Sequence, residues 1–187
     1  MFLHHIDQDL SLRLLNEKDA EELYRLIDGS RDHLREWLGW VDYIQDVNDS
    51  GEFIHDHLNG VIETGGFLKS AGILYKGSIA GIINYNDIHK QYKIGVIGYW
   101  LGEPFQGKGI MTRACKEFVN YGFTELGLNR IEIRAAPENK KSKAIPEKLG
   151  FTKEGQIRQA ERLYDHYVDH VVYGMLANEW RLSKRNE

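Results

Sequence analysis

The spacing of hydrophobic residues changes several times along the chain, and each spacing predicts an element. The run from Leu10 to Leu15 predicts a short strand, and hydrophobic residues at helical spacing predict a helix soon after it. Asn16, with Asp19 three residues later, matches a capping box in which Asp replaces Glu, so we expect that helix to begin there. A second helical stretch follows, and a third, more polar helix is expected over residues 50–63.

The middle of the chain has the pattern of paired strands. Leu68 to Tyr75 and Ser78 to Tyr85 are two runs rich in hydrophobic residues, and Lys76-Gly77 lies between them. Glycine suits the second position of a tight turn, so the two runs predict a β-hairpin. Ile94 to Leu101 predicts a further strand.

The longest amphipathic pattern covers residues 110–126, where hydrophobic residues form one stripe at helical spacing. Cys115 lies on this stripe, so we expect a buried structural thiol and not a nucleophile. Hydrophobic and charged residues then alternate strictly from Arg130 to Ala136, which predicts a half-buried strand.

The end of the chain predicts one short helix and two strands. Ser142 to Leu149 is helical in pattern, and because Pro146 is tolerated only near a helix start, we expect the helix to begin near Ser142. Phe151 to Ile157 and Tyr167 to Leu176 predict the last strands. The order of elements predicts a mixed α/β fold with one main sheet, in a single domain that covers residues 1–187.

Composition and charge narrow the class of protein. The 187 residues are 42% hydrophobic and 28% charged, which is ordinary for a globular domain, and the net charge of -4 argues against binding to nucleic acid. No hydrophobic run approaches the length of a membrane span, and the N-terminal residues lack a signal-peptide pattern. A single cysteine fits a reducing compartment, so we expect a cytoplasmic protein without a membrane partner.

The strongest local signal is the segment Gln106-Gly107-Lys108-Gly109, which lies between a predicted strand and the long amphipathic helix. Glycines let a backbone approach a ligand closely, and the first N–H groups of a helix favour an anion. Lys108 adds a positive charge, so the segment suits a pyrophosphate. The alternative is a glycine-rich loop that only turns the chain, and these four residues alone do not decide between the two. The chain has neither the P-loop pattern nor the third glycine of a dinucleotide-binding loop.

Five segments in one order and spacing carry a resemblance to a known family. They are Gly98-Tyr99-Trp100-Leu101, Gln106-Gly107-Lys108-Gly109-Ile110, Asn129-Arg130, Asn139 with Ser142, and Glu147-Lys148-Leu149-Gly150-Phe151. With them the chain resembles the GNAT acetyltransferases, in the branch of ribosomal-protein N-terminal acetyltransferases. The resemblance covers nearly the whole chain. It implies the GNAT fold, a central splayed, mixed and mostly antiparallel sheet flanked by helices, with acetyl-CoA held in the V between two strands.

The resemblance also implies a set of cofactor-binding residues. The pyrophosphate loop would comprise Gln106, Gly107, Lys108, Gly109, Ile110, Met111 and Thr112. The strand residues Tyr99, Trp100 and Leu101 would offer backbone hydrogen bonds to the pantetheine arm, and Asn139 would contact the cofactor near its thiol end. Met111 stands where the family usually has Gly or Ala, a change that a backbone N–H contact survives. The eight histidines have no third ligand at metal spacing and are expected to be solvated or at a substrate rim, so no metal is expected.

Two residues are candidates for proton transfer. Many family members have a tyrosine acid at the position of Pro146, and in the ribosomal-protein branch this role is suggested for a serine that corresponds to Ser142. Glu161 matches a glutamate proposed there as a general base acting through water, and we expect it in a polar loop between the last two strands. The structural alternatives are a helix N-cap for Ser142 and a solvated charge for Glu161.

These observations predict an acetyl-CoA-dependent N-acetyltransferase in which the acceptor amine attacks directly in a ternary complex. The N-terminal α-amine of a ribosomal protein is the expected acceptor, because an α-amine is more often neutral near pH 7 than a lysine amine. A small amine, such as an amino acid, a polyamine or an antibiotic, is an alternative acceptor, and a CoA-binding protein without turnover is a second alternative. A homodimer is expected from family analogy and from a C-terminal edge that includes Trp180.

Overall fold

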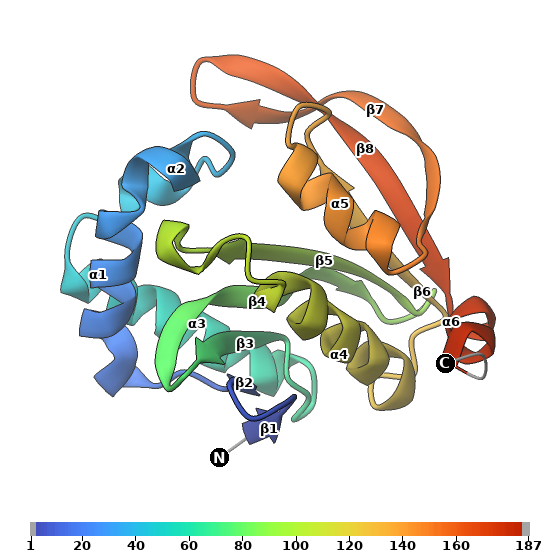
Figure 1. Cartoon of the computed structure of the whole chain (residues 1–187), viewed down its shortest axis with the longest axis horizontal. Helices are drawn as coiled ribbons and strands as arrows, with labels where there is room; N and C mark the ends of the chain where they lie inside the picture. Colours follow the sequence, from blue (N-terminus) through green and yellow to red (C-terminus); the bar gives the residue numbers. More distant parts are fainter. Residues whose placement is uncertain (1–2, 185–187) are drawn as a thin grey trace. The chain divides into compact units, whose positions relative to one another are not determined.

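The structure is a computed structural model that describes residues 3–184, with the side chains of residues 62 and 63 left out. The strands of this range, drawn in Figure 1, are β1 (Leu3–His5), β2 (Leu10–Arg13), β3 (Ser70–Tyr75), β4 (Ser78–His89), β5 (Ile94–Leu101), β6 (Arg130–Ala135), β7 (Thr152–Leu163) and β8 (His166–Leu176). The helices are α1 (Ala20–Gly29), α2 (Arg31–Arg35), α3 (Val47–Glu63), α4 (Ile110–Thr124), α5 (Lys140–Lys148) and α6 (Ala177–Lys184). Single 3-10 turns lie at Glu17–Asp19, Val41–Tyr43 and Glu103–Phe105.

The described strands are hydrogen-bonded in the order β1-β2-β3-β4-β5-β6-β8-β7. Strands β5 and β6 are parallel, whereas β1–β2, β2–β3, β3–β4, β6–β8 and β7–β8 are antiparallel pairs. The β5–β6 register runs from Ile94–Arg130 to Ile97–Ile133, although β5 continues to Leu101. The mixed, mostly antiparallel sheet with its helices confirms the predicted fold class.

The chain forms two compact units, and β4 and β5 contribute residues to both. The first unit holds the residues up to Asn84 together with Tyr99–Ala114, and the second holds Tyr85–Gly98 and the residues from Cys115 onward. The single domain over residues 1–187 stays a prediction.

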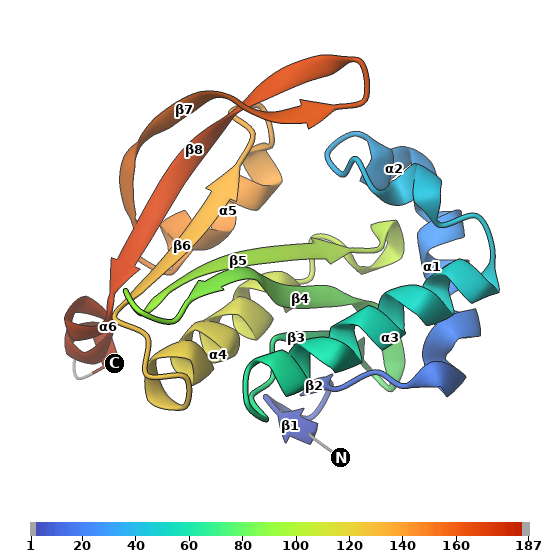
Figure 2. The same cartoon turned by 180° about the vertical axis from the view of Figure 1, so that it is seen from behind.

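The core of the first unit forms between helices α1 and α3 and the strands beside them. Leu23 and Ile27 follow one face of α1 at helical spacing, and they are fully buried in a cluster with Ile54 of α3 and Ile79 of β4. Seen from behind, α3 lies next to α1 and over the strands of this unit (Figure 2). Burial of this hydrophobic stripe explains why the periodic pattern after Asn16 forms a helix.

Local signals in the sequence explain two turns. Asn16 and Asp19 form both hydrogen bonds of the expected capping box, but this box caps the 3-10 turn Glu17–Asp19, and α1 continues from that turn at Ala20. At the β3–β4 hairpin Lys76 and Gly77 have φ values of 52° and 84°. Positive φ at both central residues matches the right-handed twist of the strands, so the predicted hairpin is confirmed.

The core of the second unit is built on β6, β8 and the later turns of α4. The alternation in β6 places Ile131, Ile133 and Ala135 in the interior, as predicted. Tyr85 stacks on Phe118, and its hydroxyl donates a hydrogen bond of 3.1 Å to the Phe118 carbonyl. Helix α5 packs against β6 and β7 (Figure 1).

Cys115 lies in this core and is fully buried, which confirms the predicted structural thiol. Burial raises the pKa of the Cys115 thiol far above its ordinary range, because a thiolate would lose its hydration there. A thiol that stays protonated is a poor nucleophile.

Several predicted boundaries are wrong. The second helical stretch ends at Arg35, and α3 begins at Val47, because the Asp46 carboxylate accepts hydrogen bonds from the N–H groups of Asn48 and Asp49. Strand β7 continues to Leu163, well beyond the predicted end at Ile157.

Helix α5 begins at Lys140, two residues before the predicted start at Ser142. Asn139 is the N-cap, and its Oδ1 accepts a hydrogen bond of 3.0 Å from the N–H of Ser142. Ser142 is therefore the third residue of the helix, and the N-cap alternative for it is wrong. Pro146 lies inside the helix, where its ring has no N–H to donate to the Ser142 carbonyl.

Trp180 does not form the exposed edge on which the dimer prediction partly rested. Trp180 belongs to α6, and its side chain is buried against α4: its ring centroid lies 6.2 Å from that of Phe123, and its Nε1 lies 3.5 Å from Oδ1 of Asn120. This packing inside the second unit removes the structural support for a homodimer through Trp180. Within residues 3–184, no helix combines the length and hydropathy needed to cross a membrane.

Candidate functional site

The loop that precedes α4 has the backbone conformation that its glycines predict. Gly107 and Gly109 have φ values of 73° and 67°, in the left-handed region that side chains other than glycine rarely adopt. A Cβ atom at either position would meet nothing within 4 Å, so conformation and not space requires glycine here. Both glycines and Lys108 are exposed, and the surface of this loop is open to a ligand.

Helix α4 begins directly after this loop, at Ile110. The first N–H groups of a helix have no partner inside the helix, and the helix dipole places partial positive charge beside them. The loop and the first turn, which include Met111 and Thr112, thus form an arrangement that suits a phosphate group in the first unit.

Arg113 fastens this loop, a role that the sequence reasoning missed. Its guanidinium donates to the carbonyls of Gly109 and Lys108 over 3.4 and 3.5 Å, and it also pairs with the carboxylate of Asp7. In a trans peptide the N–H points opposite to the C=O, so the N–H groups of Gly109 and Ile110 are directed away from Arg113. Its position four residues after Gly109, in the first turn of the helix, lets it reach the loop, but the sequence alone carries no signal for this role.

Lys108 and Gln106 contact other parts of the first unit. The Lys108 ammonium donates a hydrogen bond of 2.9 Å to the carbonyl of Pro104, and it lies 5.9 and 5.7 Å from the ring centroids of Tyr75 and Phe105. The side chain of Gln106 contacts the ring of His33. The positive charge of Lys108 therefore stays on the loop, held by cation–π contacts and one of its three N–H donors.

The predicted pantetheine strand is the end of β5. Trp100 is buried and its ring lies 5.6 Å from that of Trp40, whereas Tyr99 and Leu101 are half-buried. A Cβ at Gly81 of β4 would lie 2.1 Å from the Trp100 carbonyl oxygen, so glycine is needed for this close approach of the two strands. With the Trp100 ring buried, any ligand contact that this residue makes would come from its backbone.

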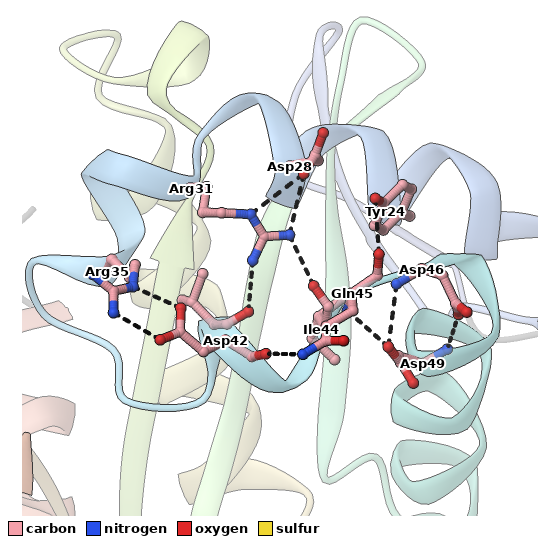
Figure 3. Close-up of polar contacts among 10 residues, drawn as sticks. Tyr24, Asp28, Arg31, Arg35, Asp42, Ile44, Gln45, Asp46 and Asp49 are labelled. Carbon is pink, nitrogen blue, oxygen red and sulfur yellow. Dashed lines mark hydrogen bonds and ion pairs between the residues drawn. The ribbon is translucent and has the colours of Figure 1, made fainter. Parts of the chain in front are cut away.

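The connection between α2 and α3 is held by a set of charged side chains (Figure 3). The Arg31 guanidinium donates to the carbonyls of Val41 and Ile44 over 2.9 and 2.8 Å and pairs with Asp28. Arg35 makes two hydrogen bonds of 2.6 and 2.7 Å with the carboxylate of Asp42. Tyr43 lies in this connection, and its side chain is among the most exposed of the large hydrophobic side chains.

In the second unit, the structure places Asn139 and Ser142 together at the start of α5. The side-chain oxygen Oδ1 of Asn139 accepts the hydrogen bond of the helix cap. The side-chain nitrogen Nδ2 is therefore the donor that Asn139 can offer to a ligand. The side chains of both residues are partly buried.

Glu161 does not lie in a polar loop, as the sequence predicted, but inside β7 opposite Val168. Its Oε2 lies 2.9 Å from Nε2 of His170 on β8. The side chain of Glu161 is 42% exposed and that of His170 is 19% exposed. His170 is thus neither fully solvated nor without a partner. The pair could not be predicted, because it depends on the register of β7 against β8.

The other histidines are also not uniformly solvated. His57 of α3 is half-buried; its Nδ1 lies 2.6 Å from the Phe53 carbonyl, and desolvation lowers its pKa. Within the part of the chain that the structure describes, no group of three or more His, Cys, Asp or Glu side chains is arranged to hold a metal ion.

Comparisons with known proteins show the family of the chain. The family model of the acetyltransferase (GNAT) domain matches residues 9–152. YdaF of Bacillus subtilis (strain 168) is 36% identical to this chain, and the match covers 98% of this chain and all of YdaF. Its name assigns it provisionally to the ribosomal N-acetyltransferases.

Two solved structures contain related cofactors. The structure of RimL, a ribosomal L7/L12 α-N-protein acetyltransferase in complex with coenzyme A, is 26% identical with a TM-score of 0.88, covering 95% of this chain and 99% of its own. The microcin C7 self-immunity acetyltransferase MccE, in complex with acetyl-CoA and AMP, is 32% identical with a TM-score of 0.85, covering 91% of this chain and 94% of its own. The chain therefore belongs to the GNAT family of acetyltransferases, close to the ribosomal-protein acetyltransferases.

Proposed function

We propose that this protein binds acetyl-CoA and transfers its acetyl group to the N-terminal α-amine of a protein, with a ribosomal protein as the acceptor. The observation that carries the cofactor assignment is the loop before α4, in which Gly107 and Gly109 adopt left-handed conformations just ahead of the helix N-terminus. The cofactor complexes of the RimL and MccE neighbours support it.

In this proposal the residues from Gln106 to Thr112 hold the pyrophosphate through backbone N–H groups. Arg113 holds the carbonyls of Lys108 and Gly109 away from the pyrophosphate, so that the N–H groups of the loop face it. The backbone of Tyr99, Trp100 and Leu101 hydrogen-bonds the pantetheine arm. Asn139 contacts the cofactor near its thiol end.

The chemistry is a direct transfer without a covalent enzyme intermediate. The neutral acceptor nitrogen forms a bond to the thioester carbonyl carbon, while a backbone N–H near Leu101 stabilises the developing oxyanion. The bond between carbon and sulfur then breaks, and CoA leaves as a thiolate. Glu161 takes the proton of the amine through a water molecule, and Ser142 donates a proton to the thiolate.

The choice of an α-amine as the acceptor follows from how readily each kind of amine loses its proton. An α-amine, with a pKa of about 7.7–8.0, is roughly a tenth neutral at pH 7, whereas a lysine amine at about 10.4 is below roughly a thousandth. With proline at position 146, the family's tyrosine acid is missing, so the proton-transfer groups are few. The names of RimL and YdaF point to ribosomal acceptors, while the AMP bound to MccE favours a small-molecule acceptor as the second candidate.

The proposal keeps a cytoplasmic location and a homodimer as its expectations. The homodimer now rests on family analogy alone, because the Trp180 ring is buried within its own chain.

Gly109→Val should weaken CoA binding at least about tenfold, because a branched side chain disfavours the left-handed backbone that directs the amides. Isothermal titration calorimetry measures the change. Gly127→Val is a matched control, since Gly127 is also exposed with a φ of 61° but lies after α4 in the second unit. Wild-type affinity in a folded Gly109→Val variant would remove the assignment of the loop.

Glu161→Gln should lower the transfer rate by about 10²-fold at neutral pH and by less at high pH, where the acceptor amine deprotonates without help. A pH–rate profile with a free N-terminal peptide measures this. Glu154→Gln, on the same strand but paired with Arg130, is the control and should keep the wild-type rate. An unchanged profile in Glu161→Gln would show that the base lies elsewhere.

Ser142→Ala should lower kcat, leave acetyl-CoA affinity unchanged and lower the melting temperature less than loss of the cap at Asn139 does, because Ser142 is not the cap of α5. Asn139→Ala is the matched comparison, and loss of its cap should cost about 0.5–2 kcal/mol of stability. Steady-state kinetics and thermal melting separate the two variants. A wild-type kcat in Ser142→Ala would exclude it as the acid.

The acceptor is tested by competition at pH 7 between a peptide with a free N-terminal Ser or Ala and the same peptide N-blocked but carrying a lysine. We expect faster acetylation of the free N-terminus, measured by mass spectrometry. Faster reaction of the blocked peptide, or of a polyamine added as a third substrate, would replace the α-amine with a side chain or a small amine.

A further inference from the structure

Strand β7 contains a bulge that sets the position of Glu161. The register passes from Ile157 opposite His170 to Glu161 opposite Val168, so β7 advances four residues while β8 advances two. In a regular ladder Glu161 would face His166, about 13 Å along the strand from His170 at roughly 3.3 Å per residue. The bulge makes Glu161 a diagonal neighbour of His170 on the same face of the sheet.

Asp169 fastens this bulge from the other face of β8. Its two carboxylate oxygens accept hydrogen bonds of 2.8 Å from the backbone N–H of Gln159 and 2.6 Å from Nε2 of Gln156. Gln159 has a φ of 49°, a left-handed conformation that the hydrogen bond to its N–H helps to hold. The hydrogen bonds from the backbone N–H of Gln159 and from the Gln156 amide lower the pKa of Asp169, so it remains a carboxylate in this role at neutral pH.

The two side chains brought together by the bulge differ in their exposure. His170 is the more buried of the two, and its Nε2 contacts one oxygen of the more exposed Glu161 carboxylate over 2.9 Å. An exposed glutamate samples several rotamers, and a hydrogen bond to one oxygen restricts them. The second oxygen, Oε1, can then take a proton from a defined place.

We propose that His170 is a positioning residue for Glu161, to which its Nε2–H donates a hydrogen bond, and that the bulge fastened by Asp169 brings the two side chains into contact. This inference rests on the proposed function, in which Glu161 is the base. In that function the proton moves from the acceptor amine through water to Glu161, and His170 keeps its own proton throughout.

Two amide variants of His170 differ in reach by one methylene group. In His170→Gln the amide nitrogen can occupy the place of Nε2 and keep the hydrogen bond, whereas the shorter Asn in His170→Asn cannot reach Glu161. His166→Asn is the matched control, because His166 lies on the same strand and face but contacts Asp165. All three replacements are polar and occupy partly exposed positions of the hairpin.

We expect His170→Asn to lower kcat about tenfold, since small misplacements of a catalytic group are costly, with the KM for acetyl-CoA unchanged. His170→Gln should stay within about threefold of wild type, and His166→Asn should match wild type. Combining His170→Asn with Glu161→Gln should give the rate of Glu161→Gln alone, because His170 acts only through Glu161. The deficit of His170→Asn should shrink at high pH in parallel with that of Glu161→Gln.

Each contrary result has a distinct meaning. If Glu161→Gln slows the reaction but His170→Asn does not, or if the two effects add, His170 has no positioning role and the proposed function stands. If His170→Gln is as slow as His170→Asn, or the deficit persists at high pH, the histidine has a different role and the inference is wrong. If Glu161→Gln keeps the wild-type rate, the assignment of the base fails, and this inference fails with it.

Discussion

The turn from β5 into α4 depends on a backbone conformation that glycine alone adopts without strain. Gly107 and Gly109 both have positive φ, and between them the chain reverses so that α4 begins with its N–H groups at the loop. The surrounding side chains follow from this turn: Arg113 reaches back to the loop carbonyls, and Lys108 folds over Tyr75 and Phe105. Because no neighbouring atom would touch a Cβ at either glycine, the constraint lies in the backbone itself.

Elements with a buried face could be predicted from the sequence. The hydrophobic stripes of α1 and α4, the alternation in β6 and the turn at Lys76-Gly77 each reflect a local preference that the tertiary structure reinforces. The segment Gln106-Gly107-Lys108-Gly109 also lies between a strand and a helix, as its pattern predicts. Arg113 was missed, since a single arginine in a first helical turn has no signature of its own.

The end of the chain was harder to predict for a physical reason. Strand β7 is exposed along nearly its whole length and occupies the edge of the sheet, so it needs no hydrophobic alternation, and its polar residues resemble a loop. The polar pattern therefore predicts a loop at Glu161, whereas its pairing with His170 depends on a strand register that includes a bulge. At α5 both Asn139 and Ser142 are good capping residues, and only the observed hydrogen bond decides between them.

The burial of Cys115 has a consequence for how such an enzyme can be followed in solution. It is the single cysteine of the chain, and in the folded state it is packed inside the second unit as a protonated thiol. If CoA is the leaving group, as proposed, a thiol-reactive dye added to a reaction mixture would thus report its release without a background from folded protein. With CoA absent, slow labelling of the same cysteine would instead record how often the packing around α4 opens, so one reagent measures turnover in one experiment and conformational opening in another.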